Sequence, residues 1–162
     1  MEELYHVTKD DSVVGRVQRN RAHDKSILHR SGIVFVVRSD GKILIQNRSP
    51  SKRIFPSCYD CSCAFHVTFG ESYDEAAKRE LREETGINGV LEYLGKFSHY
   101  DPPENQIVAV FKCQSDEQIE IDQTEAAGAN FYSRSEVEEI VALGKVTPWL
   151  RDGWRLARDR IV

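Results

Sequence analysis

The sequence predicts a mixed α/β fold, and three observations support this fold class. Segments with the apolar patterns of strands dominate the early and middle parts of the chain. Residues 73–85 change to a helical period, and two further helical segments close the chain. A length of 162 residues suits a single sizeable core, so we expect residues 1–162 to form one domain.

The expected strands are rich in β-branched and aromatic residues and are bounded by turn residues. The dipeptide Asp40-Gly41 separates two of the strongest strands and is a strong hairpin signal. A loop punctuated by proline and serine follows at residues 49–57. The segments that we expect to be strands are residues 3–8, 12–18, 29–39, 42–48, 59–67, 89–100, 106–114 and 128–133, with a turn at 101–105.

The expected helices carry start and stop signals. Gly86 follows the central helical segment, where a helix C-terminus favours glycine. Ser135 is the expected N-cap of the next helix, and Pro148 stands at the start of the last. The helical segments are residues 73–85, 135–144 and 147–161, with a helical turn at 19–26.

Charge and hydropathy exclude several classes of function. The formal net charge of −4 disfavours nucleic-acid binding through a basic face. The longest apolar run, residues 32–37, is far too short to cross a bilayer. The N-terminal segment is acidic and polar and has no signal-peptide pattern, so we expect a cytoplasmic protein without a membrane partner.

Three of the four cysteines cluster just before His66, at Cys58, Cys61 and Cys63. Their spacing lacks the paired pattern of zinc ribbons and fingers. The favoured interpretation is that Cys61 and Cys63 pack as small apolar residues on one face of a strand.

Acidic residues crowd the central helix. Steps of three and four residues place Glu80, Glu83 and Glu84 within roughly a 100° arc of the helix surface. Arg79 precedes Glu83 by one helical turn and can pair with it. The acids are either solvated and paired with basic neighbours, or they hold divalent cations, because Mg²⁺ prefers oxygen ligands.

The segment GESYDEAAKRELREETGI, residues 70–87, resembles the Nudix box, G-x5-E-x7-R-E-U-x-E-E-x-G-U, where U is a bulky apolar residue. Eight of its nine specified positions match; the opening glycine is replaced by Phe65. The resemblance implies an α/β/α sandwich with a mixed β-sheet and Mg²⁺ or Mn²⁺ as the cofactor. It also implies metal binding by Glu80, Glu83, Glu84 and Glu71, with Glu83 and Arg79 in catalytic roles.

Roughly residues 3–155 resemble isopentenyl-diphosphate isomerase and its Nudix hydrolase relatives. The isomerase needs a cysteine in a Cys-Gly-His triplet, where this chain has Ala64-Phe65-His66. It also uses a Glu-x-Glu pair, where this chain has Glu104-Asn105-Gln106, and an amide cannot take up a proton. Its metal-binding histidines resemble His23, His29 and His66, although a structural role is the more frequent one for His23 and His29.

Further candidate residues lie outside the box. Arg48, Lys52 and Arg53 flank a loop and are candidates for binding the substrate phosphates, and His66 for facing the same pocket. Glu104 and Glu125 are candidates for a general base or a distal metal ligand. For Lys52 and Arg53 ordinary solvated charge is an equal alternative. The two tryptophans of the last helix are expected in the core.

We therefore expect a Mg²⁺- or Mn²⁺-dependent Nudix hydrolase. Its substrate would be a diphosphate linkage in a nucleoside diphosphate derivative or a related small molecule. An isopentenyl-diphosphate isomerase-like enzyme and a catalytically weakened binding module remain as alternatives. The sequence names neither the substrate nor the oligomeric state, and a homodimer stays open.

Overall fold

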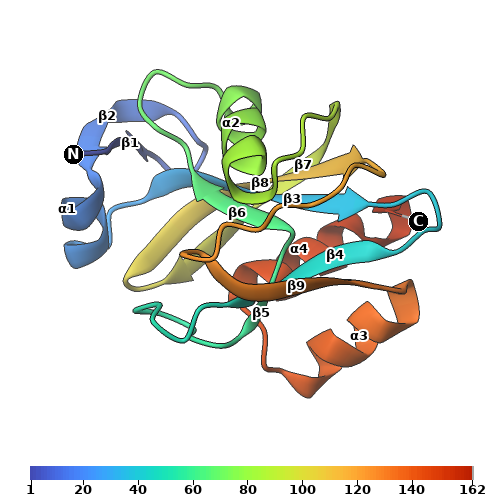
Figure 1. The fold of residues 1–162 in the computed structure, drawn as a ribbon. Coiled ribbons are helices and arrows are strands. Elements are labelled where there is room, and N and C mark those ends of the chain that lie inside the picture. The colour runs from blue at the N-terminus through green and yellow to red at the C-terminus, as the bar shows by residue number, and fades with distance from the viewer. Residues whose placement is uncertain (162) are drawn as a thin grey trace.

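A computed structural model describes residues 1–161 as a mixed β-sheet with helices on both sides (Figure 1). Helix α2 covers one side of the sheet and α4 the other, which confirms the predicted sandwich. The strands are β1 (Glu3–Val7), β2 (Val13–Gln18), β3 (His29–Val37), β4 (Ile43–Arg48), β5 (Tyr59–Asp60), β6 (Cys63–His66), β7 (Leu91–Asp101), β8 (Glu104–Gln114) and β9 (Ala126–Tyr132). The helices are α1 (Arg19–Asp24), α2 (Tyr73–Thr85), α3 (Arg134–Leu143) and α4 (Pro148–Ile161).

Strand β3 organises the sheet. It pairs in parallel with β8 along its whole length and antiparallel with β6, while β7 extends the sheet beyond β8. Strand β4 meets β3 only at the pair Val37 and Ile43, and otherwise pairs with β5 and β9. The hairpin expected at Asp40-Gly41 is present, with Gly41 at φ +83°, but its two strands diverge directly after the turn.

The segment 59–67, expected as one strand, is two. β5 pairs with β4, and β6 pairs with β3. Between them the Ser62 hydroxyl accepts a hydrogen bond from the Val36 amide (2.8 Å) and donates one to the Leu44 carbonyl (2.6 Å). This side chain links β3 to β4 where the two strands separate. The expectation that Cys61 and Cys63 share one strand face was therefore wrong, because they lie in the cores on opposite sides of the sheet.

The alternation of β3 divides the interior into two cores. Ile33, Phe35 and Val37 face α4, whereas Val34 and Val36 face α2. Continuous apolar sequence is the pattern expected of a strand that is buried on both faces. No helix among residues 1–161 has the length and apolar character needed to cross a membrane.

The helix boundaries follow from capping residues. α2 begins with a capping box between Ser72 and Glu75 and ends at Gly86, whose φ of +77° is left-handed. α3 has its N-cap at Ser133, not at Ser135 as expected, because Ser133 and Glu136 form the capping box. Pro148 is the first residue of α4, as predicted.

Candidate functional site

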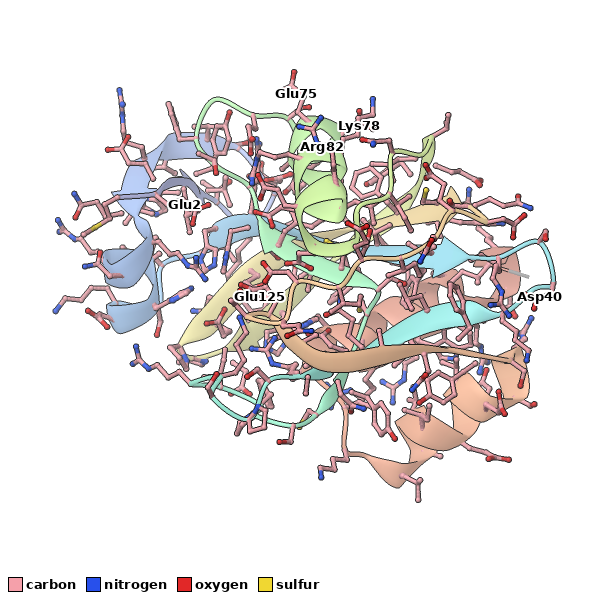
Figure 2. All side chains as sticks on the ribbon, viewed as in Figure 1. Glu2, Asp40, Glu75, Lys78, Arg82 and Glu125 are labelled. Carbon is pink, nitrogen blue, oxygen red and sulfur yellow. The ribbon has the colours of Figure 1, made fainter. Side chains whose placement is uncertain are left out.

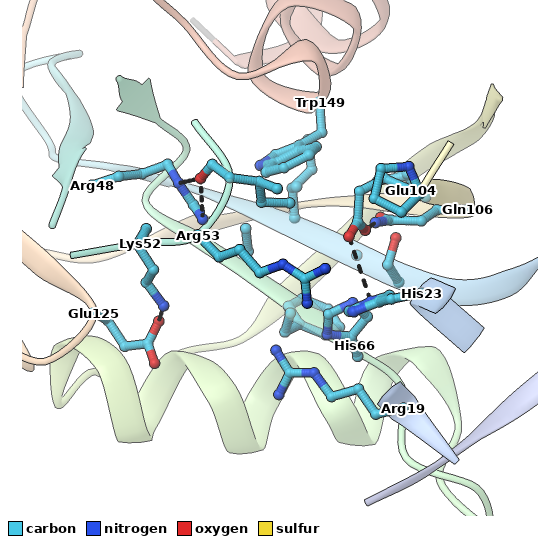
Figure 3. A pocket seen from close by; sticks show the side chains of 18 residues that line it. Arg19, His23, Arg48, Lys52, Arg53, His66, Glu104, Gln106, Glu125 and Trp149 are labelled. Carbon is cyan, nitrogen blue, oxygen red and sulfur yellow. Dashed lines mark hydrogen bonds and ion pairs between the residues drawn. The ribbon is translucent and has the colours of Figure 1, made fainter. Parts of the chain in front are cut away.

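A cavity of about 240 Å³ lies between α1, the loop that follows β4, strands β3, β6 and β8, and the start of α4 (Figure 3). Segments that are distant in sequence supply its walls. It brings together six of the residues that the sequence singles out: Arg48, Lys52, Arg53, His66, Glu104 and Glu125. The roles of these six residues stay predictions, but together they make the lining of one cavity polar and charged. The turn expected at 101–105 is shorter than predicted, which places Glu104 at the start of β8.

His23, His29, His66 and Glu104 form a compact cluster at this cavity. One potential ligand atom from each residue lies within 4.8 Å of all the others. Within residues 1–161 no other group of three or more histidine, cysteine, aspartate or glutamate side chains meets this criterion. The sequence favours structural or surface roles for His23 and His29; the only signal for a ligand role was the resemblance to the isomerase histidines.

The chemistry of these donors fits a divalent transition metal. The Nε2 atoms of His23 and His29 are buried and have no hydrogen-bond partner among the described residues. His29 Nδ1 donates to the Ile27 carbonyl (2.8 Å), which leaves a lone pair on Nε2. Burial lowers the pKa of His29 and lowers that of His66 well below its usual value, so both imidazoles are neutral, as ligands must be.

Glu104 supplies the one carboxylate of this cluster. Its Oε1 lies 3.5 Å from His23 Nε2, and its Oε2 accepts a hydrogen bond from the Gln106 side-chain amide. The two residues are i and i+2 on β8, so their side chains share one face. Gln106 thus orients Glu104 from the position at which the isomerase has a second carboxylate.

Basic side chains line the mouth of the cavity. Lys52 is paired with Glu125, and Arg19 with Glu2 at 3.3 Å. Arg53 makes no ion pair with any residue of the described chain and points into the cavity in Figure 3. The sequence alone does not point to Arg19, because its contribution depends on how α1 packs. Together these cations form a surface suited to phosphate oxygens.

Glu71 and the acids of α2 lie beside the cavity without lining it. Arg79 binds Glu71 through two nitrogens (2.6 and 3.0 Å), Glu80 at 2.7 Å and Glu83 at 3.4 Å. The Arg79 hydrogen bonds lower the pKa of Glu71, whereas burial raises that of Glu80. These acids are therefore paired with one central guanidinium rather than gathered around an ion-sized space.

Glu84 differs from its neighbours on α2. Its side chain is only 8% exposed, and burial raises its pKa to about 8. It lies against Cys63 of β6 and has no cationic partner among residues 1–161. On the opposite side of the helix Glu75, Lys78 and Arg82 point into solvent (Figure 2). The interpretation as an ordinary solvated charge cluster fits that outer side, but not Glu84.

Side chains on strand β6, which holds the positions of the isomerase triplet, alternate between the two faces of the sheet. Ala64 and His66 face the cavity, whereas Cys63 and Phe65 are buried on the α2 side. The Cys63 thiol is fully buried, and burial raises its pKa well above the usual value. The cavity therefore presents a methyl group where the isomerase presents a thiol, and the nearest cysteine in sequence points into the core.

Trp149 completes the cavity wall, and Asp60 lies behind it. Asp60, the last residue of β5, is buried, and its carboxylate accepts hydrogen bonds from the indole of Trp149 (2.8 Å) and from Arg48 (3.1 Å). Burial raises the pKa of Asp60, an effect that Arg48 opposes. Trp149, expected in the core, borders both the core and the cavity. The sequence gives no signal for Asp60, because each of its side-chain partners is remote along the chain.

Comparison with known proteins identifies the family. The NUDIX domain model matches residues 28–152, and the chain belongs to this family. An isopentenyl-diphosphate Delta-isomerase of Serratia proteamaculans is 35% identical over 98 residues, 60% of this chain and 55% of that protein. An uncharacterized Nudix hydrolase of Streptomyces coelicolor is 37% identical over 97 residues, 59% of this chain and 54% of that protein. The matched part thus spans just over half the length of these two relatives.

The fold is that of solved Nudix structures. The crystal structure of DR0079 from Deinococcus radiodurans superposes with a TM-score of 0.83 at 28% sequence identity, covering 96% of this chain and 99% of that one. The MutT protein from Methanosarcina mazei has the same fold, with a TM-score of 0.70 at 21% identity over 82% of this chain and 94% of that one. The relatives thus include both Nudix hydrolases and isomerases. The residues that line the cavity are the features that can distinguish these two activities.

Proposed function

We propose that residues 1–162 form one domain that hydrolyses a diphosphate linkage in a small molecule, either a nucleoside diphosphate derivative or a related diphosphate, with Mg²⁺ or Mn²⁺. One observation carries this proposal. The cavity combines basic side chains with potential metal ligands, while Ala64 and Gln106 occupy the positions of the isomerase's proton-transfer groups. A methyl group and an amide cannot move a proton to or from carbon.

The basic residues would bind the substrate. Arg53 and Arg19 present guanidinium groups that suit phosphate oxygens, and Lys52 can exchange Glu125 for a phosphate. The cavity of about 240 Å³ favours a compact group next to the diphosphate. His66 faces the same space and would border the substrate.

Two groups of residues would hold cations. His23, His29, His66 and Glu104 form the first. The second consists of Glu71, just before α2, and the α2 acids Glu80, Glu83 and Glu84. A bound divalent cation would neutralise the diphosphate and act as a Lewis acid at phosphorus. Arg79, which contacts Glu71, Glu80 and Glu83, would orient the acids of the second group.

Glu125 is the candidate general base. Glu104 is hydrogen-bonded to Gln106 and lies next to His23. Glu125, in contrast, lies at the cavity mouth with its side chain 41% exposed. In the proposed reaction a water oxygen bonds to one phosphorus in line with the bridging oxygen, and the bridging P–O bond breaks. Glu125 accepts the proton that the water loses, and the leaving phosphate carries away the electron pair of the broken bond.

Two alternatives stay testable. An isomerase would convert isopentenyl diphosphate without releasing phosphate, and the relatives that carry this name motivate the test. A binding module would hold a diphosphate without turnover, and Phe65 at the glycine position of the Nudix box motivates that test.

A substrate panel separates these functions. Nucleoside di- and triphosphates, nucleotide sugars, dinucleoside polyphosphates and isoprenoid diphosphates are incubated with Mg²⁺ or Mn²⁺, and both phosphate and isomer formation are measured. We expect phosphate release that falls strongly in Glu83→Gln and in Glu84→Gln. Hydrolysis that is unchanged in both variants excludes the α2 metal site, and isomer without phosphate establishes the alternative enzyme.

A further inference from the structure

Asp60 lies behind the cavity wall. Each of its carboxylate oxygens is connected to the loop that carries Lys52 and Arg53, one through Arg48 and the other through Trp149. Building on the proposed function of the cavity, we propose that Asp60 is a positioning residue for diphosphate binding. It holds residues 49–58, here called the phosphate loop, in the conformation that presents Lys52 and Arg53 to the substrate.

The two oxygens of Asp60 have separate partners. Oδ1 accepts hydrogen bonds from the Cys61 amide (2.7 Å), the Thr147 hydroxyl (3.0 Å) and the Trp149 indole (2.8 Å). Oδ2 accepts one from Arg48 Nη1 (3.1 Å). A buried carboxylate with four donors is fully satisfied, so its geometry is fixed.

The Oδ2 branch reaches the phosphate loop through Arg48. The remaining guanidinium nitrogens, Nε and Nη2, both donate to the Ile54 carbonyl, at 3.3 and 3.1 Å. Figure 3 shows Arg48 with these two bonds, directed away from the cavity centre. Arg48 therefore links Asp60 to Ile54, and three of its five N–H donors are used in these bonds.

The Oδ1 branch reaches the next residue of the same loop. Trp149, held through its indole nitrogen by Asp60, packs edge-on against Phe55 with ring centroids 5.5 Å apart. Arg48 also lies over the Trp149 ring at 5.7 Å, which joins the two branches. One carboxylate thus supports Ile54 through a hydrogen bond and Phe55 through an aromatic contact.

The loop needs this support because its backbone is strained at two places. Phe55 and Ser57 adopt left-handed φ values of +49° and +60°, which residues other than glycine rarely adopt. Such conformations persist where surrounding contacts determine them. The strained residues directly follow Ile54, where Arg48 binds, and they lie close in sequence to Lys52 and Arg53.

Asp60→Asn tests the Oδ2 branch selectively. The asparagine keeps an acceptor for the three Oδ1 donors but places an amide NH₂, which is itself a donor, against Arg48. We expect the affinity for methylenediphosphonate with Mg²⁺, a diphosphate analogue that cannot be hydrolysed, to fall by about tenfold in titration calorimetry. Hydrogen exchange of the amides in residues 51–57 rises in parallel, and KM increases while kcat changes by less than about threefold.

Asp11→Asn is the matched control. The Asp11 side chain is 7% exposed and that of Asp60 is 6%, and Asp11 also accepts bonds from cationic partners. The Asp60 partners Arg48 and Trp149 line the cavity, whereas the Asp11 partners Arg30 and Lys96 do not. Asp11→Asn should lower the melting temperature without changing diphosphonate affinity. If Asp60→Asn behaves in the same way, Asp60 is merely structural and the inference is overturned.

Three further outcomes also decide between the proposals. If Asp60→Asn does not fold, Trp149→Phe is tested instead, because it removes the indole donor and keeps a ring beside Phe55. We expect amide hydrogen exchange in residues 54–57 to be faster in this variant. Exchange at the wild-type rate refutes the inference. Diphosphonate binding without hydrolysis of any panel substrate refutes the proposed function and leaves the positioning result measurable. A wild-type chain that does not bind the diphosphonate overturns both proposals.

Discussion

The ring of Phe65 fills the space over Gly32, its direct partner across strands β6 and β3. A Cβ atom built on Gly32 would lie 2.8 Å from the ring's Cε2 atom and closer still to Cζ. The Nudix box lacks its opening glycine at residue 65, but a glycine stands opposite it on the neighbouring strand. The ring therefore packs into the α2-side core, and Phe65 also borders the cavity.

This pairing predicts that Gly32 and Phe65 are coupled in stability. In Gly32→Ala the new methyl group collides with the ring, and we expect a loss of about 2–3 kcal/mol in the free energy of unfolding. With Phe65→Gly already present, the same alanine should cost less than about 1 kcal/mol, because the space is empty. Urea unfolding of the four proteins of this cycle measures the coupling. Equal costs in both backgrounds would show that the ring does not depend on Gly32.

Phe65→Gly alone separates the effect on stability from the effect on activity. Removing a ring that is only 6% exposed should cost about 3–5 kcal/mol in the free energy of unfolding. The catalytic rate should change only a few-fold, because the ring is part of the α2-side core and only borders the cavity. Rates on the best panel substrate, measured well below the melting temperature, test this. A sharp gain in activity would instead identify Phe65 as the lesion of a weakened binding module.

Local signals were sufficient to predict α2. Its helical period and Gly86 after it predict the observed bounds, Tyr73–Thr85. Alternation along β6 likewise places Cys63 and the cavity residue Ala64 on opposite faces. The break at Ser62 could not be predicted, because it depends on hydrogen bonds to two strands that diverge only in the folded sheet.

Much of the candidate site depends on long-range packing and is therefore less visible in the sequence. His23 sits on a short helix whose position relative to β6 no local pattern fixes, yet its ring lies 5.3 Å from that of His66. The partners of Asp60 at Thr147 and Trp149 come from the far end of the chain. Arg48 was predicted as a phosphate ligand because it is a basic residue beside a loop; its commitment to Asp60 and Ile54 appears only in three dimensions.

The histidine cluster predicts metal binding that does not require the acids of α2. Mn²⁺ or Zn²⁺ should bind with about one ion per chain at this cluster, and His29→Gln should weaken that binding by at least about tenfold, since it removes a buried donor. His99→Gln is the matched control, because His99 is also buried but lies outside the cluster. Equilibrium dialysis with elemental analysis gives the stoichiometry and affinity. Equal affinity in both variants would rule out a ligand role for His29.

Asp11 predicts a pH-dependent contribution to stability. Burial alone would raise its pKa, but hydrogen bonds from Lys96 (2.8 Å), Arg30 (2.7 Å) and Tyr73 (2.9 Å) outweigh that effect and lower it. Because the folded-state pKa lies below the unfolded value, the ionised carboxylate stabilises the fold above about pH 4. That stabilisation is lost as the pH falls through the folded-state pKa.

Asp11→Asn should therefore cost about 2–4 kcal/mol in the free energy of unfolding at pH 7, because it leaves two cations without their carboxylate. The difference from wild type should shrink steadily below about pH 4 as the wild-type carboxylate takes up its proton. Asparagine tolerates the left-handed φ of +66° at this position, so the substitution adds little backbone strain. Urea unfolding of both proteins between about pH 3 and pH 7 measures the difference. A cost that is constant with pH would mean that the charge of Asp11 does not stabilise the link between the β1–β2 turn, β3, α2 and β7.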